Sequence, residues 1–318
     1  MPVCECSVTL KNSGTLGCMP IQDVARRLII VPIYDSSNAL NRIDTSSIPT
    51  NTQILALINN SDDKARFYPL PLMENVTNER ADPIIQSFPS GKNIKVRDGE
   101  KTFTGQLLLL GADYAGQIEG YGCAEVGAYI VDAQGNLIGD KSVSGYLSPI
   151  RIDKATWDVR TVDTKDQEVA YIQLGFQWKS SVKDSDIGML MYSDFASDVD
   201  WLDYNGLIDL YGTGGASSAA TDLSITITTL FGSVANPKVV TNLDTATDGS
   251  GDFTLYNVTT TSTLAMGTDV TAIVEDPAGT YTFTLANQTS SDVVSVRIAS
   301  GTNGYDDTNL SASTVTLG

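Results

Sequence analysis

Carboxylates are the only side chains of this sequence whose spacing suggests catalysis. Between residues 194 and 203, four aspartates lie beside a tryptophan and a tyrosine. The cluster consists of Asp194, Asp198, Asp200, Asp203, Trp201 and Tyr204. Two carboxylates near aromatic rings are the arrangement of a sugar-cleaving enzyme. In a chain with 38 acidic residues, however, such clusters arise by chance, and we expect no catalytic residue here.

Histidine, the side chain that most often transfers protons near neutral pH, is absent from all 318 residues. Its absence excludes Ser-His-Asp and Cys-His catalysis and every histidine-ligated metal site. The Gly-rich segment at residues 211–215 lacks the Lys-Ser/Thr ending of a phosphate-binding loop. We therefore expect a structural or binding protein with no enzymatic activity and no cofactor.

Oxygen ligands for calcium are abundant, but no segment has the full pattern of a calcium loop. Asp198-Val199-Asp200 and residues 244–252 both lack the Glu that closes the twelve-residue loop. Turn formation accounts for both stretches, so we expect no metal site. Asn-x-Ser/Thr glycosylation acceptors are a coincidence expected in a Ser/Thr-rich chain, and they include Asn59, Asn75, Asn257 and Asn287.

The redox state of the four cysteines is an open question at the level of sequence. Cys4, Cys6, Cys18 and Cys123 could bind a metal as thiolates or form two disulfides. Their spacing contains no C-x-x-C pair, and no histidine is present to complete a mixed site. Because thiols stay reduced in a protein that is assembled in the cytosol, we expect four free cysteines.

The net charge of −18 limits the classes of partner. An acidic surface repels phosphate, which disfavours nucleic-acid binding. The longest apolar run, residues 28–33, has the length of a strand rather than of a membrane-spanning helix. The N-terminus lacks the basic and apolar regions of a secretory signal, so we expect neither secretion nor a membrane partner.

The composition changes near residue 211, and this change predicts two domains. We expect a first β domain at residues 1–210, a flexible Gly/Ser/Ala-rich linker at residues 211–220, and a second domain at residues 221–318. Alternating apolar and polar residues predict strands in the second domain at residues 223–228, 253–258, 270–274, 281–285, 294–298 and 313–317. Short strands in this number and spacing are typical of an immunoglobulin-like β-sandwich.

The first 210 residues also favour β structure. Two hairpins are predicted, one pairing residues 94–97 with 101–104 around Asp98-Gly99-Glu100, the other pairing residues 128–132 with 136–138. Residues 169–178 alternate in polarity, with one fully apolar face, and predict a strand that packs on a core. Weak helical patterns occur at residues 22–27 and 193–202.

Several segments of the first domain carry a family resemblance. They are Asn75 to Asp82, Gln86-Ser87-Phe88, Ser90-Gly91-Lys92 and residues 94–105, accompanied by residues 28–37 and 131–138. Over roughly residues 20–210 the chain resembles the tail tube (major tail) proteins of tailed bacteriophages. This resemblance implies a β-sandwich or half-barrel protomer, hexameric rings stacked into a hollow tube for DNA ejection, and an immunoglobulin-like decoration on the outside.

We therefore expect an all-β structural virion protein of a phage tail, assembled in the host cytoplasm. Its partners would be further copies of itself and other tail proteins, while genomic DNA passes through without specific binding. The alternative is a capsid decoration protein, head fibre or adhesin that binds a host-surface glycan. A third hypothesis is a secreted carbohydrate-active enzyme that uses pairs of aspartates.

Overall fold

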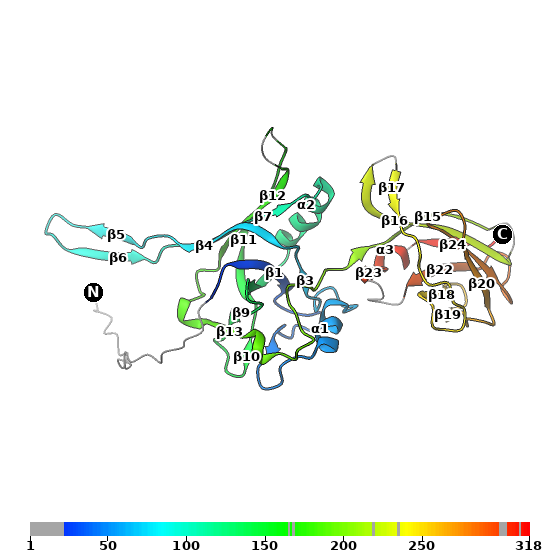
Figure 1. The fold of residues 1–318 in the computed structure, drawn as a ribbon, viewed down its shortest axis with the longest axis horizontal. Helices are drawn as coiled ribbons and strands as arrows, with labels where there is room; N and C mark the ends of the chain where they lie inside the picture. Colours follow the sequence, from blue (N-terminus) through cyan, green and yellow to red (C-terminus); the bar gives the residue numbers. More distant parts are fainter. Residues whose placement is uncertain are drawn as a thin grey trace.

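The computed structural model describes residues 22–164, 166, 169–217, 220–233, 236–298, 304–311 and 313–318. Within them the fold is all-β, as predicted: strands make up most of the regular structure, and helices are few and short. Figure 1 shows two β-rich bodies next to each other and a two-stranded arm that leaves the first body on the side away from the second. No helix among these residues is long and apolar enough to cross a membrane.

A nine-stranded antiparallel sheet forms the first body. Its strand order is β13-β9-β8-β11-β12-β7-β4, and β1 attaches to β8 and carries β3. The strands are β1 (Ala25–Pro32), β3 (Tyr68–Pro69), β4 (Met73–Arg80), β7 (Lys101–Leu108), β8 (Val126–Asp132), β9 (Leu137–Asp140), β11 (Ile150–Val162), β12 (Tyr171–Trp178) and β13 (Ile187–Leu190). A separate pair joins β2 (Ile43–Asp44) to β10 (Tyr146–Leu147).

Apolar residues cover both faces of this sheet. Along β8, Ala128 and Ile130 belong to one buried cluster, whereas Tyr129 and Val131 belong to another on the opposite face. Because successive side chains of a strand point to opposite faces, a strand covered on both sides is apolar throughout. The predicted hairpin of residues 128–132 with 136–138 is present, since Ile130 pairs with Ile138 and Val131 with Leu137.

Aromatic packing centres on β12, the strand predicted most clearly from the sequence. Ile172, Leu174, Phe176 and Trp178 are buried, and the residues between them are half-buried. The ring of Phe176 lies 5.1 Å from that of Phe103 and 5.4 Å from that of Trp157. These stacked rings fill the space between β7, β11 and β12 and account for much of this core.

Neither of the weak helical patterns of the first domain corresponds to an α-helix. The segment at residues 22–27 leads into strand β1, because pairing with β8 decides its conformation over a weak local pattern. Residues 193–202 contain only the end of a 3-10 turn, η3 (Tyr192–Asp194). The helices that do form are α1 (Asn51–Ile58) and α2 (Ala112–Glu119), and α2 continues into the 3-10 turn η1 (Gly120–Cys123).

The second body consists of two antiparallel sheets around one apolar core. The first sheet has the order β15-β16-β21-β20 with β17 beside β16, and the second has the order β19-β18-β22-β24. The strands are β15 (Tyr211–Ala216), β16 (Asp222–Ser233), β17 (Asn236–Val239), β18 (Phe253–Asn257), β19 (Ser262–Thr263), β20 (Val270–Glu275), β21 (Thr280–Leu285), β22 (Val293–Ile298) and β24 (Thr314–Thr316). Alternating burial on both sheets makes this body a β-sandwich.

The flexible linker predicted at residues 211–220 is corrected by this sandwich. Tyr211 to Ala216 form strand β15, which pairs with β16. Gly212, one of the glycines that indicate flexibility in the sequence, has a packing role here: a Cβ atom on it would lie 2.7 Å from the Ile225 side chain and 2.9 Å from Ser313. The two bodies are instead joined through β14 (Ile208–Asp209), which pairs in parallel with β23 (Tyr305–Asp306), next to the short helix α3 (Thr308–Ser311).

The hairpin predicted around Asp98-Gly99-Glu100 is also wrong. Residues 93–97 form β6 (Asn93–Arg97), which pairs with β5 (Ile84–Ser87), whereas β7 pairs with β4 and β12. The chain reverses at Phe88–Lys92 instead, where the Phe88 amide donates to the Lys92 carbonyl at 2.9 Å. Gly99 lies against the backbone of Ala81, too close for any Cβ atom, so it allows the two strands to continue side by side.

The stacked rings around β12 generate a stability prediction. Phe103→Ala removes a side chain with 0% exposure, and we expect unfolding to become easier by about 3–5 kcal/mol. All three tryptophans lie in the first body, so tryptophan fluorescence during denaturant unfolding reports on that body alone. Leu109→Ala, at a position with 79% exposure, is the control and should change stability by less than about 0.5 kcal/mol.

Candidate functional site

The aspartate cluster at residues 194–203 holds a turn in place. The Asp194 carboxylate accepts a hydrogen bond from the Met191 amide at 2.8 Å, and Asp200 accepts one from the Leu202 amide at 2.9 Å. The aromatic neighbours are inside the core, with Trp201 at 0% exposure. These carboxylates therefore do not converge on a site that a substrate could reach.

Arg27 explains why this turn carries negative charge. Its buried guanidinium group donates to the carbonyl oxygens of Trp201 and Tyr204. Burial lowers the pKa of Arg27, and the charges of Asp203 and Asp200 oppose that shift. Two of the four aspartates thus act as counter-charges for a buried arginine.

The other sequence candidates are also structural, so far as the described residues show. The Asp252 carboxylate accepts a hydrogen bond from the Asp244 amide at 2.8 Å and so closes the turn at residues 244–252. Among the residues described, no group of three or more Cys, Asp or Glu side chains could hold a metal ion. Asn257 is 1% exposed and donates to Gln288, so it is no glycosylation acceptor in the folded chain. Cys123 is a free, exposed thiol, and Cys4, Cys6 and Cys18 lie outside the described residues.

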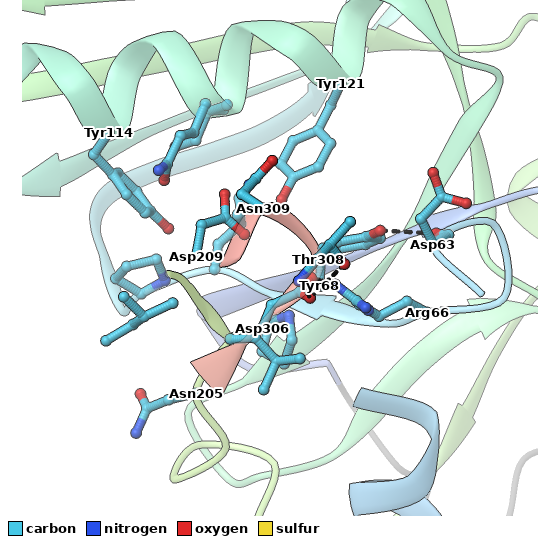
Figure 2. A pocket seen from close by; sticks show the side chains of 18 of the residues that line it. Asp63, Arg66, Tyr68, Tyr114, Tyr121, Asn205, Asp209, Asp306, Thr308 and Asn309 are labelled. Atoms are coloured by element: carbon cyan, nitrogen blue, oxygen red, sulfur yellow. Dashed lines mark hydrogen bonds and ion pairs between the residues drawn. The ribbon is translucent and has the colours of Figure 1, made fainter. Parts of the chain in front are cut away.

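A cavity of about 790 Å³ lies where the two bodies meet. The first body contributes residues around β3, α2 and η1, and the second contributes residues of β14, β23 and α3 (Figure 2). Its polar lining includes Arg66, Tyr68, Tyr114, Tyr121, Asp209 and Asp306. No spacing in the sequence indicates this site, because its residues come from five separate segments that only the fold brings together.

An ion pair between Arg66 and Asp306 fastens the two bodies at the edge of this cavity. Both side chains are largely buried, with 8% and 10% exposure. The Arg66 Nε also donates to the Asn60 carbonyl at 2.7 Å, and the guanidinium carbon lies 5.9 Å from the centre of the Tyr68 ring. Burial raises the pKa of Tyr68 to about 12, so its hydroxyl remains a hydrogen-bond donor, here to the Asp63 carbonyl at 2.8 Å.

Asp209 gives the cavity an excess of negative charge. It pairs in register with Asp306 across β14 and β23, so two carboxylates face one guanidinium group. Burial raises the pKa of Asp209, the charge of Asp306 raises it further, and Arg66 opposes the shift. Within the part of the chain that the structure describes, no hydrogen bond or ion pair reaches the Asp209 carboxylate. The site therefore has the electrostatic character of a receptor for a cation.

Aromatic side chains form the opposite wall of the cavity. Tyr114 and Tyr121 project from α2 and η1 toward Asp209 (Figure 2). Burial raises the pKa of both tyrosines, so both rings are neutral at physiological pH. Neutral aromatic faces attract ammonium and guanidinium groups. The described lining of the cavity thus combines carboxylates with neutral aromatic faces, which suits the binding of a cation.

The arm formed by β5 and β6 is the second unusual surface. Every residue of both strands is exposed, including Ile84, Ile85, Ile94 and Val96, and the turn adds exposed Phe88. Residues 83–97 contain three basic residues, Lys92, Lys95 and Arg97, and no acidic residue. The chain's charge of −18 therefore divides into +3 on this segment and −21 on the remainder.

Ion pairs hold the base of the arm and leave its tip free to contact another molecule. Arg80 binds the Asp184 carboxylate through Nε at 3.0 Å and Nη2 at 3.1 Å. Lys95 pairs with Asp98, and Arg97 with Glu100 at 3.0 Å, both in exposed positions. Lys92, at the turn, has no ion-pair partner among the described residues. The arm thus presents an apolar surface with an unneutralised cation at its end.

Neither the protein-family models nor the curated proteins contain a match to this chain. The exposed arm and the cavity between the bodies are therefore the features of the molecule that indicate a function.

The raised pKa of Asp209 predicts a pH-dependent effect of Asp209→Asn. The folded chain holds the Asp209 proton more tightly than the unfolded chain, so wild-type stability falls as the pH rises from 3.8 through the folded-state pKa. The asparagine variant has no such loss. We expect its melting temperature to exceed that of the wild type at pH 7 and to match it near pH 3, as measured by calorimetry.

Asp198→Asn, which changes an exposed aspartate outside the cavity, is the matched control. The difference between its melting temperature and that of the wild type should be no larger at pH 7 than at pH 3. An Asp209→Asn variant that is less stable than the wild type at pH 7 would contradict the assignment of Asp209 as a desolvated, uncompensated charge.

Proposed function

We propose that this chain is a structural virion protein that assembles into stacked rings forming the tail tube of a bacteriophage. The observation that carries the proposal is the exposed β5–β6 arm. The resemblance of residues 20–210 to tail tube proteins, the lack of any histidine and the acidity of the chain support the same function. In the tube, genomic DNA would pass an acidic protein that repels its phosphates, without specific binding.

The arm supports self-assembly because an isolated two-stranded hairpin is at best marginally stable in water. Its strands expose apolar side chains on both faces, and nothing else in the described chain covers them. Monomeric proteins rarely leave such a surface uncovered, whereas interaction sites are typically apolar with a polar rim. A partner that covers the arm would bury these side chains and order the hairpin.

The preferred partner is another copy of the same chain. Asp98 and Glu100 neutralise Lys95 and Arg97, but Lys92 at the tip of the arm has no ion-pair partner among the described residues. Because the chain as a whole is strongly acidic, this cation favours contact with the acidic surface of another copy. Strands β4 and β13 also end the main sheet of the first body, and each has an open edge toward which a further strand can be added. Rings of subunits cover such edges.

Electron microscopy of the concentrated, purified chain tests this function directly. We expect rings or tubes in negative stain. Ile85→Glu and Val96→Glu should abolish them, because each places a carboxylate on the contact surface of the arm. Both positions are more than half exposed, with 55% and 58% exposure, so the variants should melt at the wild-type temperature.

Val274→Glu is the matched control, since Val274 is also 55% exposed but lies on strand β20 of the sandwich. This variant should assemble as the wild type does. A chain that stays monomeric or trimeric at every concentration and binds a host glycan or a capsid would instead establish the alternative, a decoration protein, head fibre or adhesin.

A further inference from the structure

We propose that the cavity between the two bodies receives the arm tip of a second copy, with the Lys92 ammonium group beside the Asp209 carboxylate and Phe88 against Tyr114 and Tyr121. The inference rests on the proposed self-assembly and goes further, because it assigns the acceptor site for the arm. It makes the cavity a binding site for a cationic, aromatic hairpin turn.

The cavity and the arm tip carry opposite charges. The cavity holds Asp209 and Asp306 against the single guanidinium group of Arg66, with Asp63 also in the lining. A half-buried carboxylate beside a like charge is electrostatically costly unless a cation reaches it. Lys92 is exposed and lies in the acid-free segment of residues 83–97. The arm tip thus has an unpaired positive charge, and the cavity has an excess of negative charge.

The cavity also matches the arm tip in size and in aromatic character. A volume of about 790 Å³ lies in the range of about 300–1,000 Å³ in which proteins bind small ligands, so it can hold the side chains of a hairpin turn. The tyrosines offer faces for both the Phe88 ring and the ammonium group. The arm turn, Phe88–Lys92, presents these two side chains together with Pro89 at the far end of the hairpin.

Geometry requires that the arm come from a different copy. The arm extends from β4 and β7 away from the sandwich, whereas the cavity lies on the side where β3 meets β23 (Figure 1). The contact is therefore heterologous, joining two unlike surfaces of identical chains. Such contacts generate closed rings when the rotation closes and filaments when it does not. A contact that closes would lie within one ring of the tube, and a contact that does not close would join successive rings.

Carbodiimide cross-linking tests the contact in the unmodified protein. This reagent joins an ammonium group to an adjacent carboxylate as an amide with loss of water. In assemblies made from equal amounts of ¹⁴N- and ¹⁵N-labelled chains, we expect Lys92 linked to Asp209, Asp306 or Asp63 in peptides of mixed isotope content. Assemblies in which Lys92 links only to carboxylates outside the cavity would overturn the inference and leave the proposed function intact.

A charge exchange tests the same contact by a second measurement. Lys92→Glu and Asp209→Lys alone should each raise the protein concentration needed for assembly by roughly tenfold or more, as expected for the loss of one charge-assisted contact. The double variant should recover the wild-type concentration. Calorimetry on each variant shows whether it still folds, and so distinguishes the loss of the contact from the loss of the folded structure.

Lys95→Glu combined with Asp209→Lys is the matched control, because it has the same net charge as the double variant but leaves Lys92 in place. It should not recover assembly. If it recovers assembly as well as the true exchange does, only overall charge matters and the site assignment is wrong. If the wild type itself forms no rings or tubes, both the proposed function and this inference fail.

Discussion

The arm cannot bury its own apolar side chains, and this constraint decides what the molecule can do alone. A two-stranded ribbon has one neighbour per strand, so the three isoleucines and Val96 on β5 and β6 remain in contact with water. The nine-stranded sheet and the sandwich, in contrast, each close around a core of fully buried residues. The chain therefore combines two bodies that bury their own apolar cores with one segment whose apolar side chains are exposed.

The second feature is the uncompensated negative charge of Asp209 in the cavity where the two bodies meet, and it is complementary to the cation at the tip of the arm. Arg66 and Asp306 satisfy each other, and Asp209 is left beside them with a raised pKa caused mainly by burial. A sequence selected for monomer stability alone would have a neutral residue at this position, because the carboxylate adds no described hydrogen bond and repels Asp306. Local instability of this kind is common at binding sites, where it is relieved by the partner. A stabilising neutral substitution that weakens assembly would be the signature of this trade-off.

The sequence predicts the strands of this protein well and their partners poorly. Alternation at residues 171–178 and 281–285 identifies real strands, because the period of two follows from a sheet with one face on a core. The hairpin at residues 94–104 and the linker at residues 211–220 fail for a common reason. Gly99 and Gly212 mark places where another part of the chain approaches closely, and a local pattern cannot distinguish such a glycine from one that permits a turn. The cavity is beyond sequence reasoning altogether, since Arg66, Asp209 and Asp306 become neighbours only after both bodies have folded.

In the proposed assembly, the acidity of the chain would also guide association. The unpaired Lys92 at the arm tip of one copy and the acidic remainder of another would attract each other and favour a head-to-tail orientation, although salt screens this attraction over about 8–10 Å. The charged groups alone would form a weak contact, because exposed ion pairs contribute only about 0–1 kcal/mol each. In the proposed contact, most of the binding free energy would therefore come from burial of the apolar arm, and the carboxylates of the cavity would select the register in which it is buried. In the proposed contact, the strands of the hairpin would provide the affinity, and the lysine at its turn would provide the orientation. Neither the apolar strands nor the lysine would therefore be sufficient without the other.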